Sequence, residues 1–318
     1  MHPIEAWVSN DLGFSDYRFE VVSDDASYRK YYRLILNDNK TYIIMDSSMQ
    51  IESIYPFIDI SVRLLKARVQ IPRRYAQNLH DGYLLLEDLG DTHLLDILND
   101  KSYKLLYMKS IHEILKMQEA DTTGLEPYDE EFIMYEMKLM QEWYLEKHLW
   151  VRLNEDEQAD LDKVLEIIKD EVLSQPQGYF VHRDFHSRNI MFKKGKVSVI
   201  DYQDARAGAV TYDLASLLKD VYIKFDREKM LELVLEFKEL KGGNLKSVSN
   251  EQFIRWFDFM SIQRHIKILG IFARLKIRDN KPAYINDIPL TLEYIRETIS
   301  LYDELKPLEK IINKTIPS

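Results

Sequence analysis

Cysteine is absent from the 318-residue chain, which excludes disulfide bridges and cysteine-based zinc sites. Long apolar runs are absent too: none approaches the roughly 18 residues of a membrane-spanning helix, and residues 1–7 lack the basic-then-apolar pattern of a secretory signal. The formal net charge of -10 argues against a general affinity for nucleic acid. We therefore expect a cytoplasmic protein with no membrane or nucleic-acid partner, and nothing indicates an obligate protein partner.

Glycine is scarce, with 10 residues, and neither of the two glycine-rich phosphate-binding patterns, G-x-G-x-x-G and Walker A, occurs. A nucleotide, if one binds, must therefore be held by other groups. The remaining composition is that of an ordinary globular protein, with 46% hydrophobic and 30% charged residues. A chain of this length can form two packed cores.

The most informative feature that is present is His-Arg-Asp-Phe-His-Ser-Arg-Asn at residues 182–189. Asp184 is followed five residues later by Asn189, and twelve residues after that by Asp201 at the end of an apolar strand. Phosphoryl transfer needs a carboxylate that orients the attacking hydroxyl, and an amide oxygen and a carboxylate that hold Mg²⁺. The spacing predicts Asp184 as the catalytic carboxylate, Asn189 and Asp201 as Mg²⁺ ligands and ATP as the donor; the alternative is a solvated charged loop.

Three local features are expected to support this motif. Residues 193–196, Lys-Lys-Gly-Lys, predict a hairpin turn that delivers Asp201 to the loop. Asp213 begins a helix at 211–218, where a carboxylate accepts backbone N–H bonds well, so we expect it to tie the catalytic loop to that helix. The alternative is a plain helix-terminal charge. His182 is assigned a structural role in the same loop.

Ile-Asp-Tyr-Gln-Asp at residues 200–204 stands where protein kinases have D-F-G, and no A-P-E sequence follows. With residues 182–189, this pattern resembles the aminoglycoside phosphotransferase-like kinases, which phosphorylate small molecules. The resemblance implies an α+β, two-lobed protein-kinase-like fold, with an antiparallel sheet and a helix in residues 1–90 that clamp the nucleotide. A mainly helical lobe, residues 91–318, would carry the catalytic loop, the metal site and the sugar-binding helices.

Hydrophobic periodicity agrees with this division. Aromatic and β-branched residues predict strands at 17–22, 28–36, 41–45 and 83–87, with a turn at 37–39. Residues 51–69 predict a helix with apolar positions Ile54, Phe57, Ile58, Val62 and Leu65. From residue 91 the pattern is mostly helical, and the charged stretch after Leu305 predicts a terminal helix.

In kinases of this fold the third strand carries a phosphate-binding lysine, but residues 41–45 contain none. Arg29 and Arg33 alternate with Tyr31 on one face of the preceding strand, so we expect one of them to replace the lysine; otherwise both are exposed strand residues. The other expected nucleotide contacts are Ser27, in a turn at 23–27 that covers the phosphates, and the hinge residues Glu87, Asp88 and Leu89.

Four further patterns narrow the resemblance: D-A-S-x-R-x-Y-x-R at 25–33, I-I-M-D at 43–46, L-L-L-E-D-L-G-D at 84–91 and Q-R-H-x-K at 263–267. Together they resemble the bacterial cell-wall sugar kinases that phosphorylate the anomeric (C1) hydroxyl of N-acetylmuramate and N-acetylglucosamine. The resemblance implies a cytoplasmic enzyme that uses ATP and Mg²⁺ in peptidoglycan recycling. The alternatives are a related kinase for an aminoglycoside, an amino alcohol or another sugar, and a nucleotide-binding pseudokinase, which only the missing lysine favours.

The predicted amino-sugar site draws on two parts of the chain near the motif. His186, Gln203 and Asp204 neighbour the catalytic and metal-binding carboxylates in sequence and can hydrogen-bond to hydroxyls. Glu142 and Trp143, at the end of a helical pattern, offer a carboxylate and a ring platform.

A third contribution comes from a helix with an apolar face, where Arg264 offers a cation for the lactyl carboxylate that distinguishes N-acetylmuramate from N-acetylglucosamine. Arg183, Arg188 and Arg206 are alternative partners for an anion, and Arg183 could instead brace the catalytic loop. The sequence leaves the preference between the two sugars, ATP versus GTP and the oligomeric state open.

Overall fold

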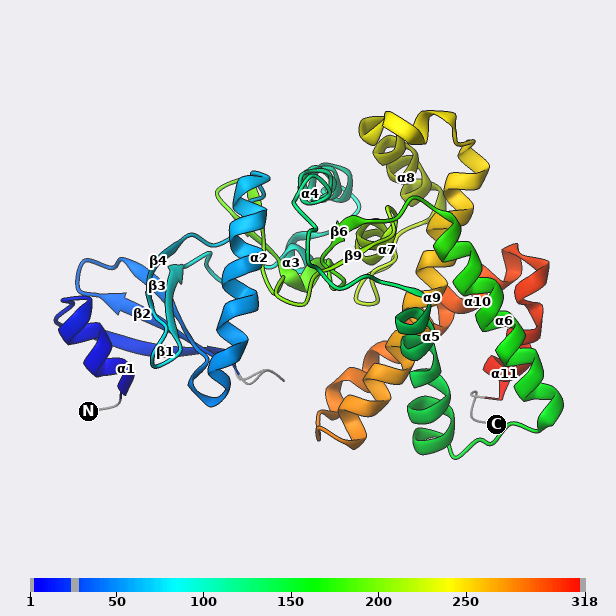
Figure 1. Cartoon of the computed structure of the whole chain (residues 1–318), viewed down its shortest axis with the longest axis horizontal. Coiled ribbons are helices and arrows are strands. Elements are labelled where there is room, and N and C mark those ends of the chain that lie inside the picture. Colours follow the sequence, from blue (N-terminus) through cyan, green and yellow to red (C-terminus); the bar gives the residue numbers. More distant parts are fainter. Residues whose placement is uncertain (1–2, 24–28, 315–318) are drawn as a thin grey trace.

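The computed structural model describes residues 3–23 and 29–314, and it has a smaller lobe built on a sheet and a larger, mainly helical lobe (Figure 1). The sheet is antiparallel throughout, in the order β1-β2-β3-β5-β4. Its strands are β1 (Tyr17–Ser23), β2 (Lys30–Leu36), β3 (Thr41–Asp46), β4 (Arg74–Asn78) and β5 (Tyr83–Glu87). The predicted α+β, two-lobed kinase-like fold is therefore confirmed.

Strands β1, β3 and β5 match the predicted segments to within one residue, and the strand expected at 28–36 is present from Lys30. Strand β4 was not predicted. Its sequence, Arg-Tyr-Ala-Gln-Asn, is short and mostly polar, and it lies at the edge of the sheet, where a strand needs little apolar surface.

Two short helices also escaped prediction: α1 (Pro3–Ala6) and the π-helical turn η1 (Trp7–Asp11). They cover one face of the sheet, where Trp7 and Val8 pack in a cluster with Leu34, Ile44 and Leu85. The opposite face is therefore the one left to meet the rest of the molecule.

That opposite face packs against α2 (Ile54–Lys66), which follows the 3-10 turn η2 (Ser48–Ser53) and stands between the sheet and the larger lobe (Figure 1). The predicted apolar face of this helix was partly wrong, because Val62 and Leu65 are exposed. Ile54 and Phe57 are buried as predicted. Because the helix begins at Ile54, its three-to-four-residue repeat then buries Ile60, Ser61 and Leu64 in place of Val62 and Leu65.

Among the described residues, the larger lobe contains ten helices, counting one π-helix, together with one small hairpin and one two-stranded sheet whose strands are far apart in the sequence. These are α3 (Leu94–Ile97), α4 (Tyr103–Met117), α5 (Glu130–Leu139), η3 (Met140–His148), α6 (Glu155–Ser174), α7 (Tyr212–Leu218), α8 (Arg227–Lys241), α9 (Asn250–Ile277), α10 (Ile288–Leu301) and α11 (Lys306–Asn313), with β6 (Tyr179–Val181) paired to β9 (Arg206–Gly208) and β7 (Ile190–Lys193) paired to β8 (Lys196–Val199). Shorter 3-10 turns are η4 (Ser187–Asn189), η5 (Gly243–Ser247), η6 (Pro282–Asp287) and η7 (Asp303–Leu305). The predicted terminal helix is α11.

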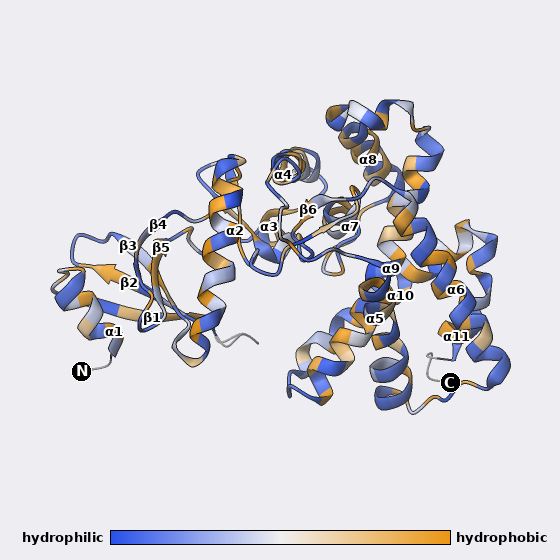
Figure 2. Ribbon diagram, viewed as in Figure 1, coloured by the Kyte–Doolittle hydropathy of each residue, from blue (hydrophilic) through white to orange (hydrophobic). Residues whose placement is uncertain are grey.

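Helix α9 is the centre of this lobe and packs against α5, α6, α7, α8 and α10. Polar residues interrupt the apolar ones along its length (Figure 2), yet most of its residues from Phe253 to Ala273 are buried. A buried helix of this kind brings polar groups into the interior of the lobe, where they need partners. None of the helices in the described part of the chain combines the length and apolar character that crossing a membrane requires.

Helix α9 approaches the end of α5 very closely at Gly270. A Cβ atom at this position would lie 2.3 Å from the carbonyl carbon of Leu139, at the end of α5. Glycine is therefore required by the crossing, although it is a poor helix former.

We predict that Gly270→Ala destabilises the protein by about 1–3 kcal/mol, because the added methyl group overpacks a backbone contact. Helix propensity alone predicts the opposite sign, a gain of about 1 kcal/mol. Urea unfolding measures the difference, and Lys276→Ala, at an exposed position of the same helix, is the control with little expected effect. A stabilised Gly270→Ala protein would contradict the close crossing.

Candidate active site

The β7–β8 hairpin brings Asn189 and Asp201 together. Its turn residues Lys194 and Gly195 have φ values of 50° and 80°, the two positive angles of a type I′ turn, so the predicted hairpin is confirmed. At its open end the N–H of Ile200 donates to the carbonyl of Asn189 over 3.1 Å. Asp201 itself is exposed and has φ 63°, a left-handed conformation that is uncommon for a non-glycine residue.

The catalytic loop is anchored to α7 by Asp213. Its carboxylate accepts the backbone N–H of His182 (2.8 Å) and of Arg183 (3.1 Å), so the predicted anchoring contact is present. Arg183 has φ 78°, and these bonds fix the loop at its most strained position.

A second anchor was not predicted. Asp220, which follows α7 and is buried, accepts the backbone N–H of Ser187 at 2.8 Å and that of Tyr222 at 3.1 Å. The two carboxylates therefore hold the beginning and the end of the loop that presents Asp184. In the sequence, Asp220 is only a second aspartate near Asp213, after the end of the same helix. A single aspartate in that position is not a pattern that predicts a contact.

His182 connects the loop to the segment before Asp201. Its Nε2 donates to the carbonyl of Ile200 (2.9 Å), and its Nδ1 accepts the N–H of Asp184 (3.3 Å). The two contacts define one neutral tautomer, with the proton on Nε2.

Asn189 and Gln203 orient the acidic groups. The Nδ2 of Asn189 donates to the carbonyl of Asp184 at 3.0 Å, which leaves the amide oxygen of Asn189 directed away from that bond. The Nε2 of Gln203 donates to Asp201 (3.1 Å) and to the exposed Asp204 (3.0 Å), while its buried Oε1 has no partner. An amide oxygen and a carboxylate at one end of a hairpin are oxygen ligands of the kind that Mg²⁺ prefers.

In the described part of the chain, no group of three or more His, Cys, Asp or Glu side chains forms a metal cluster. A cation held here by Asn189 and Asp201 would thus need further oxygens. This fits Mg²⁺, which usually keeps water and phosphate ligands beside one or two carboxylates.

Cations surround Asp184. Burial opposes its ionisation, but the charges of Lys267, Arg183 and Arg264 outweigh this effect and hold the pKa of its carboxyl well below the usual range. Burial also lowers the pKa of His186, so its ring is neutral at pH 7, and its buried Nδ1 has no hydrogen-bond partner. Asp184 is therefore an ionised acceptor beside a neutral imidazole.

Glu136 on α5 is the buried carboxylate that holds two of these cations, and the sequence reading missed it. It accepts the Nη2 of Arg183 (2.7 Å) and the hydroxyl of Tyr128, and it lies 3.5 Å from the ammonium of Lys267. Lys267 also donates to the hydroxyl of Tyr212 at 3.1 Å. Glu136 lies among apolar positions of α5, and a carboxylate on a buried helix face was the signal available in the sequence.

The arginines proposed as alternative anion partners have other contacts. Arg183 binds Glu136 and so braces the loop, and the guanidinium of Arg206 lies 3.6 Å from the centre of the Phe132 ring and donates to Pro127 O over 2.8 Å. Arg188 is exposed, with its guanidinium 3.6 Å over Tyr222.

The two candidate arginines, Arg29 just before β2 and Arg33 within it, have different partners. Arg33 binds Asp88 through Nε (2.7 Å) and Asp91 through Nη2 (2.6 Å), so it braces the hinge and is committed to carboxylates. Arg29 donates to the carbonyl of Ser53 at 3.1 Å, just before α2.

The charge of Arg29 acts on the hydroxyls of Tyr31 and Tyr202, and that of Asp201 acts on Tyr31 as well. Burial is the main reason that the pKa of Tyr31 is raised to about 12. Of the two arginines, Arg29 is thus the one that shares a neighbour, Tyr31, with the expected metal-binding carboxylate.

The remaining expected nucleotide contacts lie at the hinge. Glu87 ends β5 and Leu89 is buried, while the carbonyl of Asp88 accepts the ammonium of Lys193. Ser27 lies outside the described residues.

Glu142 and Trp143 lie on η3, and both contact Lys147. The exposed Glu142 pairs with Lys147 at 2.6 Å, and the same ammonium lies 3.6 Å over the Trp143 ring. Neither of these contacts involves a residue of the catalytic loop. The structure therefore does not bring Glu142 and Trp143 into contact with Asp184, although the sequence predicted all three in one site.

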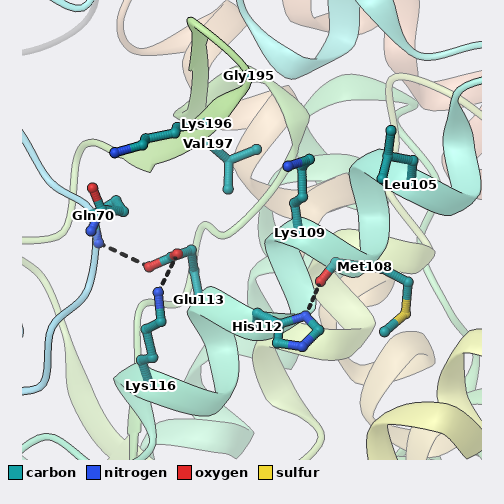
Figure 3. Close-up of a pocket in the computed structure, with 10 residues that line it drawn as sticks. All are labelled: Gln70, Leu105, Met108, Lys109, His112, Glu113, Lys116, Gly195, Lys196 and Val197. Atoms are coloured by element: carbon teal, nitrogen blue, oxygen red, sulfur yellow. Dashed lines mark hydrogen bonds and ion pairs between the residues drawn. The ribbon is translucent and has the colours of Figure 1, made fainter.

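A surface hollow of about 430 Å³ lies elsewhere, between α4 and the β7–β8 turn (Figure 3). Figure 3 shows Glu113 bound to the backbone of Gln70 (2.9 Å) and to Lys116 (2.7 Å) at one side of it. No residue of the catalytic loop lines this hollow.

Residues 18–239 match the phosphotransferase enzyme family, and they make up more than half of the chain. The protein therefore belongs to this family and is a kinase with a hydroxyl group as acceptor.

Among its relatives, an N-acetylmuramate/N-acetylglucosamine kinase of Neisseria meningitidis is 33% identical and covers 97% of this chain and 94% of its own. The enzyme of the same name from Pseudomonas aeruginosa is 34% identical, with 91% and 86% covered, and that from Pseudomonas putida is 35% identical with the same coverage.

Solved structures show the same fold at much lower identity. An ADP-bound aminoglycoside phosphotransferase is similar with a TM-score of 0.62 and 16% identity, over 93% of this chain and 98% of that one. An ethanolamine kinase of Plasmodium vivax has a TM-score of 0.66 and 14% identity, over 93% and 88%.

Proposed function

We propose that the protein transfers the γ-phosphoryl group of ATP to the anomeric hydroxyl of N-acetylmuramate and N-acetylglucosamine, as a cytoplasmic step of peptidoglycan recycling. The observation that carries the proposal is the ionised Asp184 held beside Asn189 and Asp201 by buried anchors. The choice of substrate rests on the relatives of 33–35% identity.

In this proposal Asp184 accepts a hydrogen bond from the sugar hydroxyl and takes its proton. A hemiacetal hydroxyl is more acidic than an ordinary alcohol, so a carboxylate whose pKa is held low can still serve. Asn189 and Asp201 hold Mg²⁺, which neutralises charge on the phosphates when it is bound. Residues 1–90 would clamp the nucleotide, with Arg29 near the phosphates and Glu87, Asp88 and Leu89 along the adenine.

Residues 91–318 would bind the sugar. His186 and Gln203 have buried polar atoms without partners, His186 Nδ1 and Gln203 Oε1, and these support contacts with hydroxyl or acetamido groups. Asp204, Arg264, Glu142 and Trp143 complete the proposed site. A pseudokinase role is disfavoured because Asp184, Asn189 and Asp201 are all present.

Asp184→Asn should lower kcat by about 10²–10⁴-fold and leave ATP binding measurable, because the amide keeps the shape of the side chain and cannot take the proton. Asp201→Ala should weaken Mg²⁺-dependent ATP binding as well. Steady-state kinetics and ATP titrations with and without Mg²⁺ make the comparison. Near-normal turnover by Asp184→Asn would contradict the catalytic assignment.

Arg29 and Arg33 should respond differently to replacement by methionine. Arg29→Met should raise the KM for ATP and lower kcat with little change in the sugar KM, whereas Arg33→Met, its matched control, should mainly reduce stability by freeing Asp88. Kinetics and thermal unfolding of both variants provide the measurements. Equal ATP kinetics in the wild type and Arg29→Met would mean that another cation replaces the lysine.

The position of the new phosphate tests the substrate. Phosphorylation at C1 removes the reducing end of the sugar, and phosphorylation at C6 keeps it. Incubation with ATP, Mg²⁺ and N-acetylmuramate or N-acetylglucosamine should give an acid-labile product that no longer reduces ferricyanide and whose phosphorus is coupled to the anomeric proton. A product with an intact reducing end, or a preference for kanamycin-like amines over both sugars, would refute the substrate assignment while leaving the kinase class unchanged.

A further inference from the structure

Arg264 carries a buried positive charge for which the described chain supplies no direct counterion. Its side chain is 2% exposed, and its Nε and Nη1 are buried without a hydrogen-bond partner. It makes no ion pair with a carboxylate of the described residues. Burying a charged group in this way is costly unless a partner arrives.

The neighbouring cations are different. Arg183 and Lys267 share the carboxylate of Glu136, and Lys267 also donates to the hydroxyl of Tyr212. Arg264 lies one helical turn before Lys267 on the same face of α9, with its guanidinium 5.7 Å from the centre of the Tyr212 ring. Two cations of this cluster thus have a carboxylate partner, and the third, Arg264, has none among the described residues.

Arg264 lies close enough to the catalytic loop for its charge to be felt there. The charge of Arg264 acts on both Asp184 and His186. His186 Nδ1 and Ser187 Oγ, on the catalytic loop, are also buried without partners. Unpaired polar atoms on the loop and on α9 indicate a common ligand between them that carries negative charge and hydrogen-bonding groups.

We propose that Arg264 binds the lactyl carboxylate of N-acetylmuramate and makes the site prefer the carboxylate-bearing sugar over N-acetylglucosamine. This inference rests on the function proposed above and adds its specificity-determining residue. A guanidinium suits a carboxylate because two parallel N–H groups match its two oxygens. N-acetylglucosamine, which has no such group, would still present its C1 hydroxyl to Asp184 but would leave the guanidinium without an anion.

The competing interpretation is that Arg264 only offsets the negative charges of Asp184 and Asp213 through space. In that case its removal would impair the phosphorylation of both sugars equally. If it binds the lactyl group, its removal must change the ratio between them. The ratio of the two kcat/KM values therefore separates the interpretations.

The first measurement uses the unaltered protein. N-acetylmuramate, its lactyl methyl ester and N-acetylglucosamine are compared as substrates with ATP and Mg²⁺. The acid should exceed the ester in kcat/KM by about 10-fold to 100-fold, the range for a charge-assisted hydrogen bond. If the acid and the ester had equal kcat/KM values, the inference would be wrong. This test uses only the unaltered protein, so its result does not depend on whether a variant folds.

The second measurement combines the substrates with three variants as a double-mutant cycle. Arg264→Met should abolish the difference between acid and ester and lower kcat/KM for N-acetylmuramate far more than for N-acetylglucosamine. Arg264→Lys, which keeps the charge but not the paired donors, should retain part of the difference. Lys276→Met removes an exposed charge from the same helix and should leave the ratio as in the wild type.

The outcomes are distinct. Equal losses for both sugars in Arg264→Met, or an acid-to-ester ratio that survives the substitution, would overturn the role of Arg264 and leave the proposed function in place. If the unaltered protein phosphorylated neither sugar, the proposed function itself would fail. Calorimetric titration of N-acetylmuramate without nucleotide gives a readout independent of turnover, and a weaker Kd in Arg264→Met is expected.

Discussion

The two hydrogen bonds that Asp213 accepts from the backbone of His182 and Arg183 are the contacts on which the site depends. They hold Arg183 in a left-handed conformation that a non-glycine residue adopts only when its surroundings determine it. With the backbone fixed there, the side chain of Arg183 binds Glu136 on α5. The same bonds fix the backbone that carries the next residue, Asp184. Asp220 fixes the other end of the loop, so the orientation of Asp184 is set before any ligand binds.

A second consequence is the concentration of buried charge around Tyr212. Arg183, Lys267 and Glu136 come from the loop, α9 and α5, and their mutual contacts satisfy a carboxylate and two cations inside the protein. In such an interior each charge acts strongly on the others, which explains why Asp184 stays ionised although it is largely withdrawn from solvent. The helix that supplies Lys267 also crosses α5 at Gly270, so packing and electrostatics are coupled in one element.

The two lobes are joined by contacts on either side of the expected nucleotide site. At the hinge, Arg33 ties β2 to Asp88 and Asp91, and beside α2 the ring of Phe57 lies 4.9 Å from that of Tyr202, next to Asp201. Tyr202, the residue after the proposed metal-binding aspartate, is therefore packed against the helix of the smaller lobe. This arrangement makes the position of Asp201 sensitive to both lobes.

The sequence alone determined the parts of the protein whose geometry is local. The loop at 182–189 and the hairpin that follows it are recognisable because turn types and strand alternation depend on residues close in the chain. Tertiary structure alone decided which side chains meet. Glu136 and Arg183 are 47 residues apart and Arg33 and Asp88 are 55 apart, so packing, and no local pattern, assigned Arg33 to the hinge and left Arg264 without a counterion. Strand β4 and the buried face of α2 were missed or misplaced for the same physical reason: burial is a property of the folded neighbours and not of the segment itself.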